Sequence, residues 1–373
     1  MSDQDKKISS KELMKSVIQR VATGPELSKN ISREEARDTM NAILNRDVSD
    51  IRSAIFLIAL RMKRETKDEN LGVQDAMNEN VIQINSSVND VINIADPYDG
   101  YTRNIPSSLY LLPVLAELGL PSFSQGVHTV GPKYGCTHHQ ILKLLGLDVT
   151  AKSEEVLSRL ENKEIGWGYI DQSIFSPKLY GLMDLRSEII KRPVITTIEV
   201  LANPIKAKKT HFVTGYVHKP YPPIYLMLAR NADFDSSMVI RGTEGGIVPS
   251  LRQRVNAHFY RDKNDADQVI EIEPNADLNL MQDVRAVKIP DSIQKTKKID
   301  KIETKVNPEE IAKESLKLGI SALEGEKGPM RDCIALSATL ILQHVTGNSV
   351  KDCFKEVNNI LDSGSALKRF KQV

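Results

Sequence analysis

Apolar residues recur at helical spacing through the first 85 positions of the chain. One such face is formed by Leu13, Val17 and Val21. Ser32 and Glu35 have the spacing of a capping box, which places the start of a second helix at this point. The run from Ile51 to Met62 is strongly apolar and predicts a third helix. We therefore expect a small helical domain over residues 1–85.

The pattern changes at about residue 86 to short runs of β-branched residues separated by glycine and proline. We expect strands at 91–94, 120–124, 194–198, 211–216 and 237–240. Helical stretches alternate with these runs, and one of them is expected at 179–190. We expect the segment that contains this helix, residues 177–191, to join the small domain. The alternation predicts a large α/β domain over residues 86–373, with a central, mostly parallel sheet flanked by helices.

The last part of the large domain begins with a lysine-rich segment, residues 286–305. It carries Lys288, Lys295, Lys297, Lys298, Lys301 and Lys305. A solvated connector is the simpler interpretation, and an electrostatic contact with nucleic acid is the alternative. Amphipathic helices are expected after it at 308–319, 330–345 and 350–361.

Two polar loops, at 96–108 and 125–139, each follow a predicted strand and precede an apolar helix. Because loops at the carboxyl ends of neighbouring parallel strands converge, these two are expected to share one crevice that could hold a phosphate group. Ser107 and Ser108 are also ordinary helix N-cap residues, so a capped helix behind a turn remains the simpler interpretation of the first loop.

Three further features bear on chemistry. Glu244 lies in the turn Gly242–Gly246, which follows the strand at 237–240 and should reach the same sheet edge. Its carboxylate could face a ligand or a metal, and a solvent-exposed loop carboxylate is the simpler interpretation. The adjacent His138 and His139 point about 100° apart on a helix, so they do not form a metal site by themselves. The sequence contains no nucleophile-elbow motif, and a hydrolase triad is not indicated.

Composition narrows the class of protein. With 50 basic and 49 acidic residues the net charge is +1, so any binding to nucleic acid must come from a local patch. The three cysteines, Cys136, Cys333 and Cys353, are far apart, which favours a reducing compartment over a disulfide framework. The longest apolar run, at 54–60, is too short to span a bilayer. We expect a cytoplasmic protein without a membrane partner.

Together these residues resemble the anthranilate phosphoribosyltransferase family, of glycosyltransferase family 3, over nearly the whole chain. The resemblance is carried by 31–36 and 59–72 in the helical region, by 175–177 with Arg186, by 197–204, and by 331–338 and 361–367 near the end. It implies a small α domain with a large α/β domain, and a homodimer formed through the small domains.

The resemblance also implies a diphosphate cradle, a divalent metal and a pocket for an aromatic acid, and this chain departs from the family in each motif. The family's Gly-Thr-Gly-Gly-Asp falls on 95–99 and keeps only Asp99, whereas its Asn-Ile-Ser-Thr is better kept at 104–107. Its Lys-His-Gly-Asn falls on 124–127 and keeps Gly126. Ile247 and Val248 stand where the family has its metal-binding Asp-Glu pair, so the protein side of a Mg²⁺ site is altered.

The implied site can still be drawn residue by residue. The expected ligands of a phosphorylated sugar are Asp99, Gly100, Arg103, Asn104, Ser107, Ser108, Gly126, His128 and Lys133, where His128 or Lys133 replaces the missing lysine. Arg186 matches the family's arginine for the carboxylate of anthranilate, and with His138 it is expected on the acceptor side. Glu244 is a further candidate at this edge.

Two hypotheses follow from the resemblance. In the first, the chain is a divergent paralogue that binds or transfers a phosphorylated pentose, or another anionic small molecule, with ordinary anthranilate activity lost. In the second, it is a non-catalytic homodimer that binds nucleic acid without sequence preference. The loop residues Tyr98, Asp99, Gly100 and Arg103 and the turn Gly242–Gly245 resemble divergent relatives of that second kind.

Overall fold

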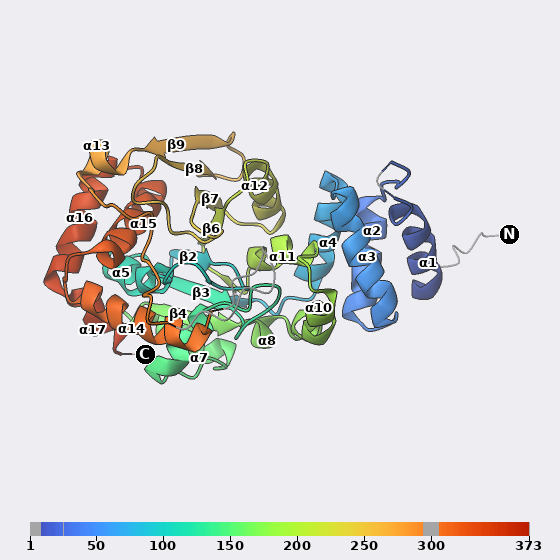
Figure 1. Cartoon of the computed structure of the whole chain (residues 1–373), viewed down its shortest axis with the longest axis horizontal. Coiled ribbons are helices and arrows are strands. Elements are labelled where there is room, and N and C mark those ends of the chain that lie inside the picture. Colours follow the sequence, from blue (N-terminus) through green and yellow to red (C-terminus); the bar gives the residue numbers. More distant parts are fainter. Residues whose placement is uncertain (1–8, 25, 294–305, 373) are drawn as a thin grey trace.

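The computed structural model describes residues 9–24, 26–293 and 306–372. A small helical bundle stands at one end of the molecule, beside a larger α/β body (Figure 1). Its helices are α1 (Ser10–Val21), α2 (Arg33–Leu44), α3 (Asp50–Lys63) and α4 (Lys67–Glu79). A serine or threonine side chain caps each of the four, and Ser32 with Glu35 forms the predicted capping box.

The α/β body is built on a seven-stranded sheet in the order β4-β3-β2-β6-β7-β8-β9. The strands are β2 (Asp90–Ala95), β3 (Ser122–Gly126), β4 (Trp167–Asp171), β6 (Lys209–Tyr216), β7 (Ser236–Arg241), β8 (Val255–Tyr260) and β9 (Gln268–Ile272). The first five pair in parallel, whereas β8 and β9 continue the sheet antiparallel. Two short strands, β1 (Ile84–Asn85) and β5 (Ile205–Lys206), pair separately. This architecture confirms the predicted fold class.

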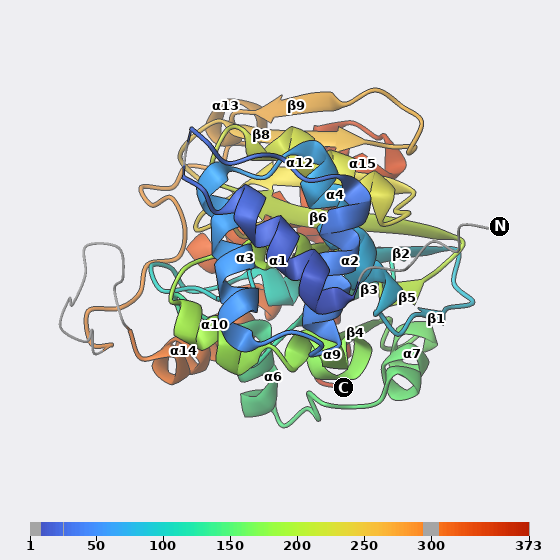
Figure 2. The same ribbon diagram turned by 90° about the vertical axis from the view of Figure 1, so that its right-hand side faces the viewer.

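Helices cover both faces of the sheet. On one side α5 packs on β3 and β4, and α15, α16 and α17 pack on α5; on the other α12 packs on β6, β7 and β8. Along β7, Met238 and Ile240 pack into the hydrophobic core on the α5 side of the sheet, and Val239 packs into the core on the α12 side. This is expected because side chains alternate across a strand. The core on the α12 side continues into the helical bundle, where α12 contacts α4. Figure 2 shows the bundle in front of the sheet.

The remaining helices connect the strands or complete the layers. They are α5 (Leu111–Glu117), α6 (His138–Leu145), α7 (Ser153–Glu161), α8 (Gln172–Phe175), α9 (Pro177–Tyr180), α10 (Met183–Ile189), α11 (Ile195–Ile198), α12 (Tyr221–Asn231), α13 (Pro274–Leu278), α14 (Pro308–Leu323), α15 (Pro329–Thr346), α16 (Val350–Ser363) and α17 (Ser365–Phe370). Two 3₁₀ turns, η1 (Ser108–Tyr110) and η2 (Glu199–Leu201), precede α5 and follow α11. None of the helices in the described ranges is both long and apolar enough to cross a membrane.

The structure corrects the predicted strand at 194–198, which is the short helix α11 followed by η2. Pro193 precedes it, and its carbonyl accepts the first helical hydrogen bond, from the Thr196 N–H. Burial against the helical bundle outweighs the β preference of these residues, since that preference depends strongly on context. The predicted helix at 179–190 is divided into α9 and α10, with Gly181 between them. Of the lysine-rich segment, residues 294–305 lie outside the described residues.

Candidate functional site

The order of the strands places a crevice between β2 and β6. From β2 the chain proceeds to β3 and β4 on one side, whereas β6 and β7 extend the sheet on the other. At such a reversal the loops leaving the two strands turn away from each other, and ligands of open α/β sheets bind there. A pocket of about 400 Å³ lies at this point. We call it the switch-point pocket.

Several elements line the switch-point pocket. Residues 97–99 follow β2, residues 214–218 end β6, and Glu244 with Gly245 follows β7. The rest of the lining comes from Arg61, Arg103, Lys133, Arg192, Thr196, Thr197, Val200, Tyr221 and Tyr225. The α/β body and the helical bundle therefore both contribute to it, because Arg61 belongs to α3.

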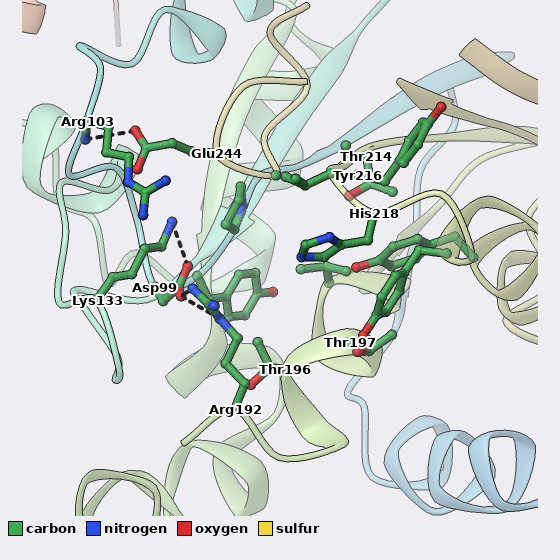
Figure 3. A pocket seen from close by; sticks show the side chains of 18 of the residues that line it. Asp99, Arg103, Lys133, Arg192, Thr196, Thr197, Thr214, Tyr216, His218 and Glu244 are labelled. Carbon is green, nitrogen blue, oxygen red and sulfur yellow. Dashed lines mark hydrogen bonds and ion pairs between the residues drawn. The ribbon is translucent and has the colours of Figure 1, made fainter. Parts of the chain in front are cut away.

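Two cations converge on Asp99, whose carboxylate is buried (Figure 3). The Nζ of Lys133 lies 3.1 Å from Oδ1, and the Nε of Arg192 donates to Oδ2 at 3.0 Å. The side chain of Arg192 is 44% exposed at the pocket mouth. The pocket holds four cationic side chains, of Arg61, Arg103, Lys133 and Arg192, against the carboxylates of Asp99 and Glu244. This excess of positive charge favours an anionic ligand.

Aromatic rings form another part of the pocket wall. Tyr221 and Tyr225 stand 6.0 Å apart between ring centroids, and His218 lies 6.3 Å from Tyr221. Arg61 donates from Nη2 to the Tyr221 hydroxyl at 2.7 Å. Burial raises the pKa of Tyr225, so this tyrosine is a neutral hydroxyl at physiological pH. The wall can hold a sugar or a flat ring by contact, beside cations that would hold its phosphate.

Glu244 does not point freely into solvent. Its carboxylate accepts hydrogen bonds from the backbone N–H groups of Thr102, Arg103 and Asn104, at 3.1, 2.9 and 3.0 Å. The Thr102 hydroxyl and the Asn104 side-chain amide each add one at 3.2 Å. Three successive N–H groups that converge in this way form an anion-binding nest. The turn after β7 therefore holds the side chain of Glu244 against the loop that follows β2.

The space between the two loops predicted as a crevice is almost filled. A cavity of about 10 Å³ remains there, lined by Asp96, Tyr101, Gly126 and His138 among others. Tyr98 closes it by donating to the Oε1 of Gln125 at 2.9 Å. Such a volume holds about one water molecule, so no phosphorylated sugar fits without rearrangement.

Asp96 stands where the resembling family has the threonine of its Gly-Thr-Gly-Gly-Asp motif. Its carboxylate accepts from Tyr101 at 2.9 Å, from the Ile247 N–H at 3.0 Å and from the Ser108 hydroxyl, and His138 Nε2 is 3.2 Å away. Burial by itself raises the pKa of Asp96, but the hydrogen bonds, led by that of His138, lower it below the ordinary value. Ser108 is therefore engaged by an internal carboxylate and does not cap a helix.

Arg186, expected to hold the carboxylate of an acceptor, holds a carboxylate of the chain itself. Its Nη1 and Nη2 both donate to Glu199 at 2.6 Å, and the two side chains are 2% and 1% exposed. Glu199 lies in η2, just after the stretch that we had predicted as a strand. This bidentate geometry satisfies the carboxylate and neutralises the guanidinium.

The predicted site residues are thus divided among several places. Asp99, Arg103, Lys133 and Glu244 line the switch-point pocket, and Gly126 and His138 line the small cavity. The residues that line neither of these two are Gly100, Asn104, Ser107, Ser108, His128 and Arg186. Sequence reasoning missed Arg61, Arg192, His218, Tyr221 and Tyr225. The one signal for His218 was its position just beyond the end of the predicted strand at 211–216.

The metal site of the resembling family does not fit this chain. Ile247 is fully buried and Val248 is 3% exposed, both within the apolar core. Their aliphatic side chains offer no oxygen ligand for Mg²⁺. Within the described ranges, no group of three or more His, Cys, Asp or Glu residues could hold a metal ion.

Comparison with known proteins identifies the class. Residues 15–81 match the helical bundle domain of the glycosyl transferase family. An uncharacterized protein of Aquifex aeolicus is 32% identical over 275 residues, which cover 72% of this chain and 80% of that protein. The anthranilate phosphoribosyltransferase of the same organism is 24% identical over 96% of both chains.

A solved structure shows the same fold. The anthranilate phosphoribosyltransferase from Saccharomyces cerevisiae, in complex with PRPP and Mg, superposes with a TM-score of 0.73 at 15% identity, over 95% of each chain. With the helical bundle, the parallel sheet and the full-length match, the chain belongs to the anthranilate phosphoribosyltransferase family, as a divergent member.

Proposed function

We propose that the protein binds a phosphorylated pentose, or another small molecule that carries a phosphate, in the switch-point pocket. The observation that carries this proposal is the convergence of Lys133 and Arg192 on buried Asp99, with Arg61 and Arg103 in the same pocket. Thr196 also lines the pocket, and its Oγ1 atom is buried without a hydrogen-bond partner among the described residues. A relative of the same fold is complexed with PRPP.

Transfer to anthranilate is not part of this proposal. The family's metal pair is replaced by Ile247 and Val248, and Arg186 is neutralised by Glu199. Asp99 can accept hydrogen bonds from sugar hydroxyls, whereas the cations neutralise phosphate charge. The pocket therefore supports recognition of a sugar phosphate, and any transfer reaction would use a different acceptor.

Calorimetric titration tests the proposal. The ligands are ribose 5-phosphate and phosphoribosyl pyrophosphate, the latter with and without Mg²⁺. We expect saturable binding to the wild type, and Arg192→Ala and Arg103→Ala should each weaken it by about tenfold or more, since a charge-assisted hydrogen bond is worth roughly 1.5–3 kcal/mol. Arg252→Ala is the matched control, because Arg252 is exposed and lies outside the pocket. Absence of binding across the panel would refute the proposal.

A second candidate function is binding of nucleic acid. The observation that favours it is the combination of exposed Arg103, Arg192 and His218 with tyrosine rings along one cleft, because single strands bind to cations and stacking surfaces together. Lys206 does not extend this surface, since it lies in β5, before the start of β6, and pairs with Asp233. A labelled oligothymidylate in the same titrations should bind with a steep salt dependence if this candidate is right.

We also propose that the protein is cytoplasmic, since free, buried cysteines are ordinary in a reducing compartment. We further propose that it forms a homodimer through the helical bundle. Helix α3 exposes an apolar stripe at helical spacing: Ile51 is 75%, Ile55 is 42% and Met62 is 74% exposed. Exposed apolar side chains aligned along one helix in this way favour a protein interface. A second copy of the chain is its proposed occupant.

Sedimentation analysis of Met62→Glu tests the dimer. We expect the wild type to be a dimer and the variant a monomer, because the interface cannot easily solvate two buried carboxylates. Met281→Glu is a closely matched control, since Met281 is 76% exposed and lies in the α/β body. A monomeric wild type would exclude the dimer, and a dimeric Met62→Glu variant would exclude this interface.

A further inference from the structure

The turn after β7 brings a carboxylate to a site built for an oxyanion. The nest at residues 102–104 supplies three backbone N–H donors, one hydroxyl and one side-chain amide, all directed at Glu244. A single carboxylate rarely needs five donors, whereas a tetrahedral oxyanion has enough oxygens to use them. The carboxylate oxygens of Glu244 stand in for two oxygens of such an anion.

The backbone of the turn is shaped to deliver this carboxylate. Glu244 has a φ of 54°, in the left-handed region that residues with a side chain adopt at some cost, and Gly245 follows with a φ of 88°. The conformation is kept although it is unfavourable for a glutamate, because the hydrogen bonds to the nest stabilise it. Contacts 140 or more residues apart in sequence therefore hold two strand-end loops together.

The nest meets the switch-point pocket at Arg103, whereas Thr102 and Asn104 do not line that pocket. Glu244 and Arg103 both line that pocket, and Figure 3 shows the glutamate directed at Arg103 beside the group formed by Lys133 and Asp99. An anion in the pocket could therefore reach the nest without crossing the core. What it meets there is a glutamate tethered by its own backbone, so a free anion competes with an intramolecular ligand.

We propose that Glu244 is an internal competitor for an oxyanion-binding site formed by the N–H groups of Thr102, Arg103 and Asn104, and that it excludes phosphate from this nest. The nest binds inorganic phosphate, or the terminal phosphate of an ester, when the glutamate is removed. Glu244 thus determines specificity: the intact protein rejects a phosphate at the nest. This inference goes beyond the proposed function and does not depend on which ligand the cations hold.

Titration with inorganic phosphate tests the inference, followed by ¹H–¹⁵N spectra of the amides of residues 102–104. In Glu244→Ala we expect saturable shifts of these three amides, with at least a tenfold gain in phosphate affinity at the nest over the wild type. Phosphate should also raise the melting temperature of the variant and leave that of the wild type nearly unchanged, as binding to the folded state alone requires.

Two further variants keep the test decisive. Glu161→Ala is the control, because Glu161 also accepts from a backbone N–H, that of Ser87, yet lies outside the pocket; we expect no gain. Glu244→Gln keeps the size of the side chain, and it replaces the alanine variant should that one not fold. The inference would be overturned by any of three outcomes. The shifts could be equal in wild type and variant, the folded variant could show no shifts at 102–104, or the shifts could be confined to Lys133 and Arg192. Failure of the pentose titration alone would leave these outcomes unaffected.

Discussion

Glu199→Ala is expected to lower the free energy of unfolding by about 3–5 kcal/mol, because it leaves the charge of Arg186 buried without a partner. Both side chains are at most 2% exposed, and both guanidinium Nη atoms bond to the same carboxylate. Among the described residues, the Nε of Arg186 has no hydrogen-bond partner, and Glu199 is the only acidic side chain that pairs with this arginine. Urea denaturation followed by circular dichroism measures the loss.

Two variants separate loss of the pair from loss of packing. Asp267→Ala breaks another arginine–carboxylate pair, with Arg230 at 2.8 Å, whose side chains are 27% and 44% exposed. It should cost about 1 kcal/mol or less, as partly exposed pairs do. Arg186→Met with Glu199→Leu should recover most of the stability, since replacing both buried charges removes the desolvation penalty. If the double variant is as unstable as Glu199→Ala, the buried charge is not the cause.

The protein is expected not to transfer a phosphoribosyl group to anthranilate. Loss of a metal that neutralises departing pyrophosphate removes several kcal/mol of transition-state stabilisation, or a rate factor on the order of 10³ or more. Arg186 is also unavailable to hold the acceptor, because Glu199 occupies it. Anthranilate fluorescence in the presence of phosphoribosyl pyrophosphate and Mg²⁺ should stay constant. A tryptophan-requiring strain that lacks the ordinary enzyme should not be rescued.

Restoring the family's metal residues should not restore the reaction. Ile247→Asp with Val248→Glu would place two carboxylates in the apolar core, beside the N–H that Asp96 accepts, and should destabilise the protein. Growth of the strain with the wild-type gene would show that another group performs the metal's role. Growth with the double variant only would show that the rest of the active site is intact.

The sequence predicted those parts of the site that depend on chain order. Asp99, Arg103, Lys133 and Glu244 were named as candidates, and all four line one pocket. Their positions just after predicted strands indicated a common sheet edge, since parallel strands end on the same side. Arg192 and Tyr221 were not found, because a charge before a proline and a tyrosine at a helix start carry no periodic or motif signal.

The sequence also left open where the crevice would be. It indicated the gap between the loops that follow β2 and β3, but that gap is filled by Tyr98, Gln125 and Asp96. The larger pocket lies between β2 and β6, whose adjacency is set by pairing across more than a hundred residues. Strand order is a long-range property, and local patterns do not encode it directly.

By itself, the sequence determined the helical bundle, four of the seven strands of the main sheet and the family, because helical spacing, β-branched runs and motif residues are local patterns. Only the tertiary structure decided which charged side chains are already paired within the protein and which are available to a ligand. Glu244 meets the N–H groups of residues 102–104, Glu199 meets Arg186, and Asp96 meets His138. Each pairing depends on side chains brought together across the fold, where burial leaves an unpaired charge too costly to remain.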